Sequence, residues 1–95
     1  MRSRYSAYVE LDERYLLRSW HPSTRPRHVP FDPDLRWVQL EIVGSHAGGL
    51  LDREGEVEFV AHHERSGRPG TLHERSRFAR HERRWVYLDA AQRSR

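Results

Sequence analysis

The chain has 95 residues, a length that holds one domain with one modest core and leaves no room for a second. Charged residues make up 33% and apolar residues 36%, but three Trp, four Tyr and three Phe provide the core anchors that disordered chains lack. The net charge of +3 comes from seventeen arginines dispersed among fourteen acidic residues, a pattern that does not favour nucleic-acid binding.

Cysteine and long apolar segments are both absent from the sequence. Without cysteine there are no disulfides or thiolate zinc sites, and redox chemistry does not indicate a compartment. The first residues contain no apolar run typical of a signal peptide, and no stretch approaches the ~20 apolar residues of a membrane helix. We therefore expect a cytoplasmic protein without a membrane partner.

The first third of the chain is predicted to be helical. Tyr5, Tyr8 and Val9 have the i, i+3, i+4 spacing of an amphipathic helix, which we place over residues 2–10. A second helix is expected over residues 13–20.

The ends of the second helix are marked by particular residues. Asp12 is placed to cap its first turn, and Trp20 lies on its apolar face near the end. His21 and Pro22 end the helix, because a residue before proline avoids the α region. Residues 22–34 then contain four of the five prolines and are predicted to be an ordered, irregular connection.

Four later segments alternate with the period of two that is typical of strands. They are residues 35–43, 56–64, 71–80 and 83–90. Residues 44–55, which contain several glycines, are predicted to form a long hairpin loop. Helices followed by consecutive antiparallel strands indicate an α+β fold, with the N-terminal helices packed on a curved four-stranded antiparallel sheet. We expect a single domain over residues 1–91 and a polar tail over 92–95.

The pattern "TLHERSRFAR" predicts how the third strand pairs with the second across a loop at residues 65–70. Placing Val57 opposite Phe78 and Glu58 opposite Arg77 joins apolar to apolar residues and an acid to a base. In this register Arg75 and Arg77 point outward, whereas Glu74 and Ser76 point inward.

A family resemblance covers nearly the whole chain, from residue 1 to about residue 90. Its motifs are "MRSRYSAYV", "SWHPSTRP", "EVEFVA", and "LHERSRF" leading to "RWVYLD". In this order they resemble the YchJ family of uncharacterised bacterial proteins. The resemblance implies a nuclear-transport-factor-2-like (cystatin-like) fold, a cone in which a bent antiparallel sheet wraps over helices. It supplies no established reaction.

The chain departs from the family pattern in two places. Longer members carry a cysteine-rich, zinc-binding SEC-C segment ahead of this domain, and no such segment is present here, so a role that depends on it is not carried over. The last hairpin of the family usually turns through Asp-Gly, whereas this chain has Glu82 and Arg83. Neither residue readily accepts positive φ, so we expect a less secure turn.

Glu74 is the main candidate for a functional group, because it points inward beside Ser76. Proteins of similar fold often bind small molecules inside the cone, and some use a carboxylate as general acid or base. The predicted pocket-lining residues are Tyr5, Trp20, Phe59, Glu74, Ser76 and Tyr87. The structural alternative is that Glu74 pairs with Arg4 or Tyr5 and joins the first helix to the sheet.

The histidines provide weaker candidates. His21 would be a catalytic candidate if it oriented Glu74, although its alternative role is to end the helix before proline. The predicted register places His62 opposite His73, where two imidazoles and Glu64 have the ligand types of a zinc site. On an outer face such a site lacks the second shell that stabilises a metal, so we predict neither metal nor cofactor.

Trp37 is predicted to lie on the outer face of the sheet, because strict alternation puts Val38, Leu40 and Ile42 on the other face. There it would anchor a homodimer through the outer sheet face, unless a twisted sheet covers it with residues 31–34.

Two functions are consistent with this sequence. The favoured one is non-enzymatic binding of a small molecule or a protein partner. The alternative is a small enzyme, similar to isomerases or dehydratases, that uses Glu74 as general acid or base.

Overall fold

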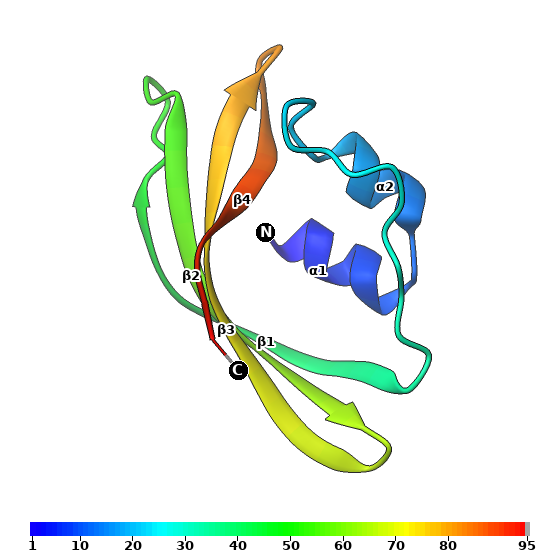
Figure 1. The fold of residues 1–95 in the computed structure, drawn as a ribbon. Helices are drawn as coiled ribbons and strands as arrows, with labels where there is room; N and C mark the ends of the chain where they lie inside the picture. The colour runs from blue at the N-terminus through cyan, green and yellow to red at the C-terminus, as the bar shows by residue number, and fades with distance from the viewer. Residues whose placement is uncertain (95) are drawn as a thin grey trace.

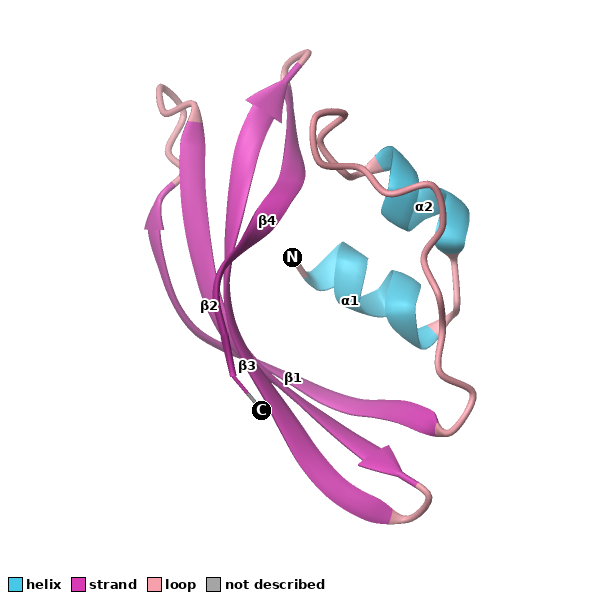
Figure 2. Ribbon diagram, viewed as in Figure 1, coloured by secondary structure: helices cyan, strands magenta, loops and turns pink. Residues whose placement is uncertain are grey.

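The computed structural model describes residues 1–94, with side-chain surroundings for residues 1–91. Two helices, α1 (Arg2–Val9) and α2 (Glu13–Arg18), precede four strands. The strands form one antiparallel sheet in the order β1-β2-β3-β4 (Figure 1), and they are β1 (Leu35–Ala47), β2 (Glu54–Arg65), β3 (Arg68–His81) and β4 (Arg84–Ser94). The sheet curves around the helices, which lie on its concave side (Figure 2). The predicted α+β fold is confirmed.

Helix α1 forms in the predicted place, but its buried residues are Arg4 and Ala7, and Val9 of the predicted apolar face is 49% exposed. Helix α2 begins as predicted and ends at Arg18, two residues before the predicted end. Asp12 is the N-cap of α2, and its Oδ1 accepts a hydrogen bond of 3.0 Å from the backbone N–H of Tyr15. The two helices and the following connection share a small core of Ala7, Leu16 and Val29. Among the described residues, no helix is long and apolar enough to cross a membrane.

The end of α2 is attached to the edge of β4. His21 N donates to the carbonyl of Tyr87 at 2.7 Å, and Tyr87 N donates to the carbonyl of Ser19 at 2.8 Å, so that Trp20 forms a parallel bridge with Tyr87. This pairing satisfies backbone groups that an edge strand otherwise exposes, and it fixes the helices over one side of the sheet.

Strand β1 is longer and less regular than predicted. It continues to Ala47, so the loop to β2 is confined to residues 48–53. Its pairing with β2 shifts between Trp37 and Gln39, and again between Ile42 and Gly44. Such bulges leave one residue unpaired and bend the strand, which contributes to the curvature of the sheet.

The first bulge corrects the predicted position of Trp37. Because Val38 is the extra residue, Trp37 shares the concave face with Leu40, and Val38 is 52% exposed. The Trp37 ring lies 6.4 Å from the ring of Tyr8 on α1 and 5.5 Å from that of His63. The outer-face position derived from strict alternation was therefore wrong.

The register of β2 and β3 differs from the prediction by two residues. Phe59 lies opposite Glu74 and Val57 opposite Ser76, because the chain reverses through a two-residue turn and not through a loop at 65–70. Both turn residues, Ser66 and Gly67, have positive φ (51° and 82°), as a tight hairpin requires. A two-residue shift preserves the face on which each side chain lies, so the inward placement of Glu74 and Ser76 is confirmed.

The last hairpin also turns tightly. His81 pairs with Arg84, and the two residues between them, Glu82 and Arg83, have φ of 50° and 69°. The primed turn therefore forms without glycine, at the steric cost that side chains incur in the left-handed region. Strand β4 runs beyond residue 91 into the segment predicted as a polar tail.

Candidate functional site

The buried polar centre of the domain is built around Glu74. This side chain is only 4% exposed, and Ser76, two residues along β3, is 1% exposed. Ser76 Oγ donates a hydrogen bond to Glu74 Oε2, and Tyr87 Oη on β4 donates to the same oxygen at 3.5 Å. A buried carboxylate is stable only when such partners replace water.

Arg4 of α1 brings a positive charge to this centre. It is 5% exposed, and its Nη1 donates to the carbonyl of Leu16 at 3.0 Å and to Ser19 Oγ at 2.6 Å. Its guanidinium carbon lies 4.9 Å from the ring centroid of Trp20 and 4.6 Å from that of Tyr87. Burial lowers the pKa of Arg4 from its usual value, while the nearby tyrosines and Glu74 oppose that shift.

These contacts join the helices to the sheet. Ser76 and Tyr87, which donate to Glu74, belong to the sheet, and Arg4 contributes its charge from the helix. The predicted burial of Glu74 is confirmed, whereas the hydrogen bonds described for it come from strands and not from helix residues. The arrangement can hold α1 against β3 and β4 by charge and hydrogen bonding.

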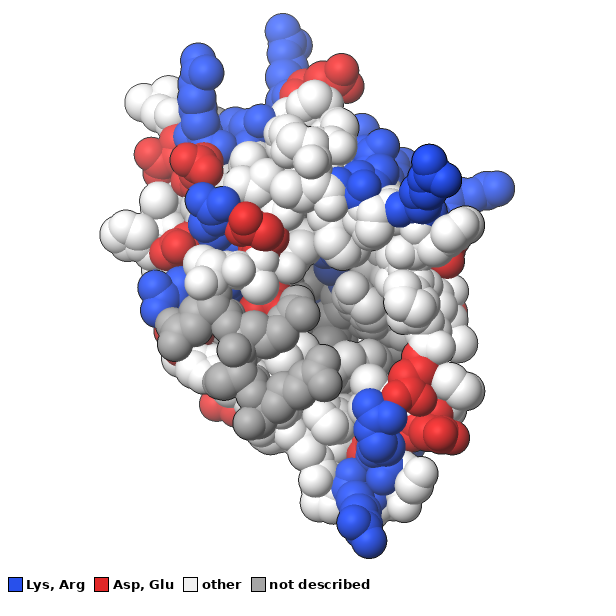
Figure 3. Space-filling model, viewed as in Figure 1, with Lys and Arg blue, Asp and Glu red and all other residues white. Residues whose placement is uncertain are grey.

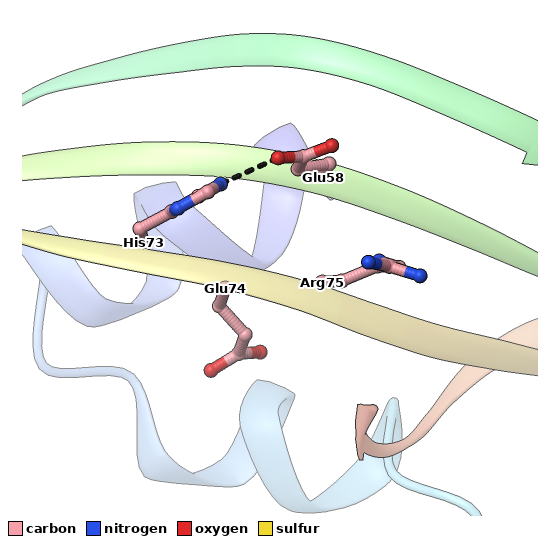
Figure 4. Close-up of a pocket in the computed structure, with 4 residues that line it drawn as sticks. All are labelled: Glu58, His73, Glu74 and Arg75. Atoms are coloured by element: carbon pink, nitrogen blue, oxygen red, sulfur yellow. Dashed lines mark hydrogen bonds and ion pairs between the residues drawn. The ribbon is translucent and has the colours of Figure 1, made fainter. Parts of the chain in front are cut away.

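Glu74 is separated from the ion pair on the other face of the sheet. Figure 4 shows His73 and Glu58 directed toward each other, with 2.5 Å between Nε2 and Oε2, while Glu74 points the opposite way, toward the helices. The hollow that these residues line together with Arg75 has a volume of about 10 Å³, room for about one water. It does not accommodate a substrate.

A much larger groove lies on the concave face, beside the β1–β2 loop. Its volume is about 320 Å³. Apolar side chains supply most of its walls, and the lining residues are Met1, Ser45, Ala47, Gly48, Gly55, Glu56, Val57, Phe78 and Trp85. None of the six residues predicted to line a pocket belongs to this described set. Phe59 is instead buried beneath the helices, and Tyr5 is half-buried on α1.

Comparison with known proteins shows which family the chain belongs to. The family model described as the YchJ middle NTF2-like domain matches residues 1–90. The chain belongs to the YchJ family. The NTF2-like fold of this family agrees with the two helices and the curved sheet of the structure.

Curated relatives of the YchJ family carry the name UPF0225 protein. The protein of Streptomyces avermitilis is 54% identical over 89 residues, which cover 94% of this chain and 61% of that protein. The relative in Streptomyces coelicolor is 51% identical over 89 residues, covering 94% and 68%. The Chromobacterium violaceum relative is 48% identical over 91 residues, covering 93% and 67%. The chain thus spans about three fifths to two thirds of the length of these relatives. No solved structure matches the chain.

The histidine arrangements considered from the sequence are not those of this YchJ-family domain. His21 Nδ1 accepts a 3.0 Å hydrogen bond from Ser23 N, and its ring lies 5.1 Å from that of His81; the described contacts do not bring it to Glu74. In the observed register His62 lies opposite Thr71 and not opposite His73. Over the described part of the chain, no group of three or more potential metal ligands is present.

The groove itself was missed by sequence reasoning. Val57 and Phe78 lie on the inner face of the sheet, but an inner position does not reveal whether a helix covers it. The signal available in the sequence was the small residues at Gly48 and Gly55, where the backbones approach so closely that a Cβ at Gly55 would lie 2.8 Å from Gly48 Cα.

Proposed function

We propose that this YchJ-family domain binds a small, largely apolar molecule in the concave groove and catalyses no reaction on it. The observation that carries the proposal is the groove of about 320 Å³ walled by Val57, Phe78 and Trp85. This volume is at the lower end of the ~300–1,000 Å³ that is usual for ligand sites. Aromatic walls provide large apolar contact area, and Ser45 offers a polar contact for orientation.

The position of Glu74 favours binding over proton transfer. A general base must come within hydrogen-bond reach of the proton it removes. Glu74 does not line the groove, is 4% exposed, and already accepts hydrogen bonds from Ser76 and Tyr87. A fold shared with enzymes does not by itself imply an activity.

The outer face of the sheet offers less evidence for a binding partner than the groove does for a ligand. Cross-strand ion pairs cover it, including Arg36 with Glu64 at 2.9 Å and Arg77 with Asp89 at 2.7 Å. Figure 3, which looks toward the edge of the sheet, shows basic and acidic residues close together on that side of the molecule as well. A homodimer through this face, a protein partner and a cytoplasmic location therefore stay predictions from the sequence.

The test is to fill the groove without disturbing the core. Ser45 is an exposed residue of β1 on the groove side, so Ser45→Phe should occupy the space that a ligand needs. Gln39→Phe is the matched control, because Gln39 is exposed on the same strand but lies opposite His62, away from the groove. The probe is 1-anilinonaphthalene-8-sulfonate, whose fluorescence rises on apolar surfaces.

We expect saturable binding to the wild type, at least tenfold weaker binding to Ser45→Phe, and unchanged binding to Gln39→Phe. A ligand found in a metabolite screen should also raise stability by about 2.7 kcal/mol at a hundredfold excess over Kd. Equal affinity of all three proteins, or no binding to the wild type, would contradict the proposal.

A further inference from the structure

The loop between β1 and β2 is held by hydrogen bonds, although its apolar side chains make little contact with the domain. Leu50 and Leu51 are 87% and 94% exposed. Asp52 N nevertheless donates to the carbonyl of Gly49 at 3.1 Å, and Gly49 N donates to Asp52 Oδ2 at 2.9 Å. Hydrogen bonds, and not apolar packing, therefore shape this loop, whose first residue, Gly48, lines the groove.

Arg80 connects this loop to the opposite wall of the groove. Its Nε donates to the carbonyl of Asp52 at 3.0 Å, and its Nη2 donates to the carbonyl of Gly49 at 3.5 Å. The guanidinium carbon lies 4.5 Å from the ring centroid of Trp85, which faces Arg80 across the β3–β4 pair. One planar side chain thus contacts two carbonyls of the loop and one aromatic ring of the groove wall.

We propose that Arg80 is the positioning residue of the groove: it fixes the β1–β2 loop relative to Trp85 and so sets the groove's width. The effect on ligand affinity rests on the proposed binding function. The role of Arg80 in fixing the loop relative to Trp85 does not depend on it. The planar guanidinium suits the role because it donates in several fixed directions while its face stacks on the indole. A lysine in place of Arg80 would keep the positive charge but would lack the planar group with donors in fixed directions.

Ligand affinity depends on this positioning because a preformed site does not have to order its walls on binding. If Arg80 is removed, the two loop carbonyls lose a charged donor and Trp85 loses the group that covers its ring. The loop then samples other positions, and a bound molecule must order the loop before it gains full contact with Phe78 and Trp85. The unfolding of the whole domain is affected less, because the Glu74 centre lies elsewhere in the sheet.

The experiment compares Arg80→Ala, Arg80→Lys and the control Arg84→Ala by two independent measurements. Arg84 is an exposed arginine of the same β3–β4 hairpin. The first measurement is amide hydrogen exchange at Gly49 and Asp52, which reports the loop without any ligand. The second is the Kd of 1-anilinonaphthalene-8-sulfonate, with urea unfolding to show that each variant is folded.

For Arg80→Ala we expect at least tenfold faster exchange at both amides and at least tenfold weaker probe binding, with a nearly unchanged urea midpoint. Arg80→Lys should fall between it and the wild type, and Arg84→Ala should match the wild type. Unchanged exchange in Arg80→Ala would overturn the positioning role, as would faster exchange with unchanged probe affinity. A wild type that binds no probe counts against the proposed function, and the exchange rates then decide the role of Arg80 alone. If Arg80→Ala unfolds, the same exchange comparison in Arg80→Lys decides it.

Discussion

Glu74 and Ser76 lie two residues apart on β3, and the serine hydroxyl donates to the glutamate carboxylate where the two side chains are 4% and 1% exposed. Alternate residues of a strand share one face, so this contact follows directly from the pleat of the sheet. The contact lies between the helices and β4, where Tyr87 also donates to the carboxylate and Arg4 brings a positive charge. The interior between the helices and the sheet therefore contains a buried polar centre at Glu74 and Ser76.

Glu74→Ala is expected to lower the free energy of unfolding by about 3–5 kcal/mol, the cost of removing one partner from a buried charged group. The loss arises because Arg4 is left in the core without the opposing carboxylate. Urea denaturation followed by circular dichroism measures it. Glu58→Ala, an acid on the neighbouring strand and the outer face, is the control and should cost under about 1 kcal/mol. A loss of less than about 1 kcal/mol in Glu74→Ala would show that the carboxylate is not structural.

Arg77 and Asp89 predict a pH effect on the convex face. Two hydrogen bonds of 2.7 Å from the guanidinium hold the pKa of Asp89 below its ordinary value. Because the folded carboxylate binds its proton less readily than the unfolded one, its stabilising contribution is complete above about pH 4 and is lost as the pH falls further. The contribution is small, since the pair is exposed to screening by solvent and salt.

The direct measurement is an NMR titration of the Asp89 carboxyl carbon. Arg77→Gln should raise the pKa of Asp89 toward its ordinary value, whereas Arg36→Gln, on the distant strand β1, should leave it unchanged. An equally low pKa of Asp89 in both variants would mean that Arg77 is not the cause.

The turn between β3 and β4 gives a prediction of increased stability. Arg83 has φ of 69°, a conformation that costs a side chain about 1–2 kcal/mol and glycine nearly nothing. Since glycine also loses more entropy on folding, Arg83→Gly should stabilise the domain by a net of about 0.5–1 kcal/mol. Thermal unfolding monitors the change, with Arg84→Gly as the control that should destabilise. A lower melting temperature for Arg83→Gly would refute strain at this position.

Side-chain parity explains how much of the structure the sequence predicts. Alternation in "TLHERSRFAR" assigns Glu74 and Ser76 to the inner face, and a register error of two residues does not alter that assignment. Alternation failed at Trp37 because the bulge at Val38 depends on pairing with β2, which no local pattern encodes. The groove was not foreseen for a similar reason: it depends on how far the helices extend over the sheet.

Trp37 offers the last test, because its position decides between a core role and an interface. The structure places its ring on the concave face beside Tyr8 and His63, half-buried. Trp37→Ala should therefore lower the free energy of unfolding by about 2–3 kcal/mol, somewhat less than the loss of a fully buried ring. Val38→Ala, at the exposed bulge residue beside it, is the control and should change stability by less than about 0.5 kcal/mol. Sedimentation velocity at matched concentrations should give the same molar mass for the wild type and both variants. If Trp37→Ala keeps its stability but shifts from dimer to monomer, Trp37 belongs to an interface and not to the core.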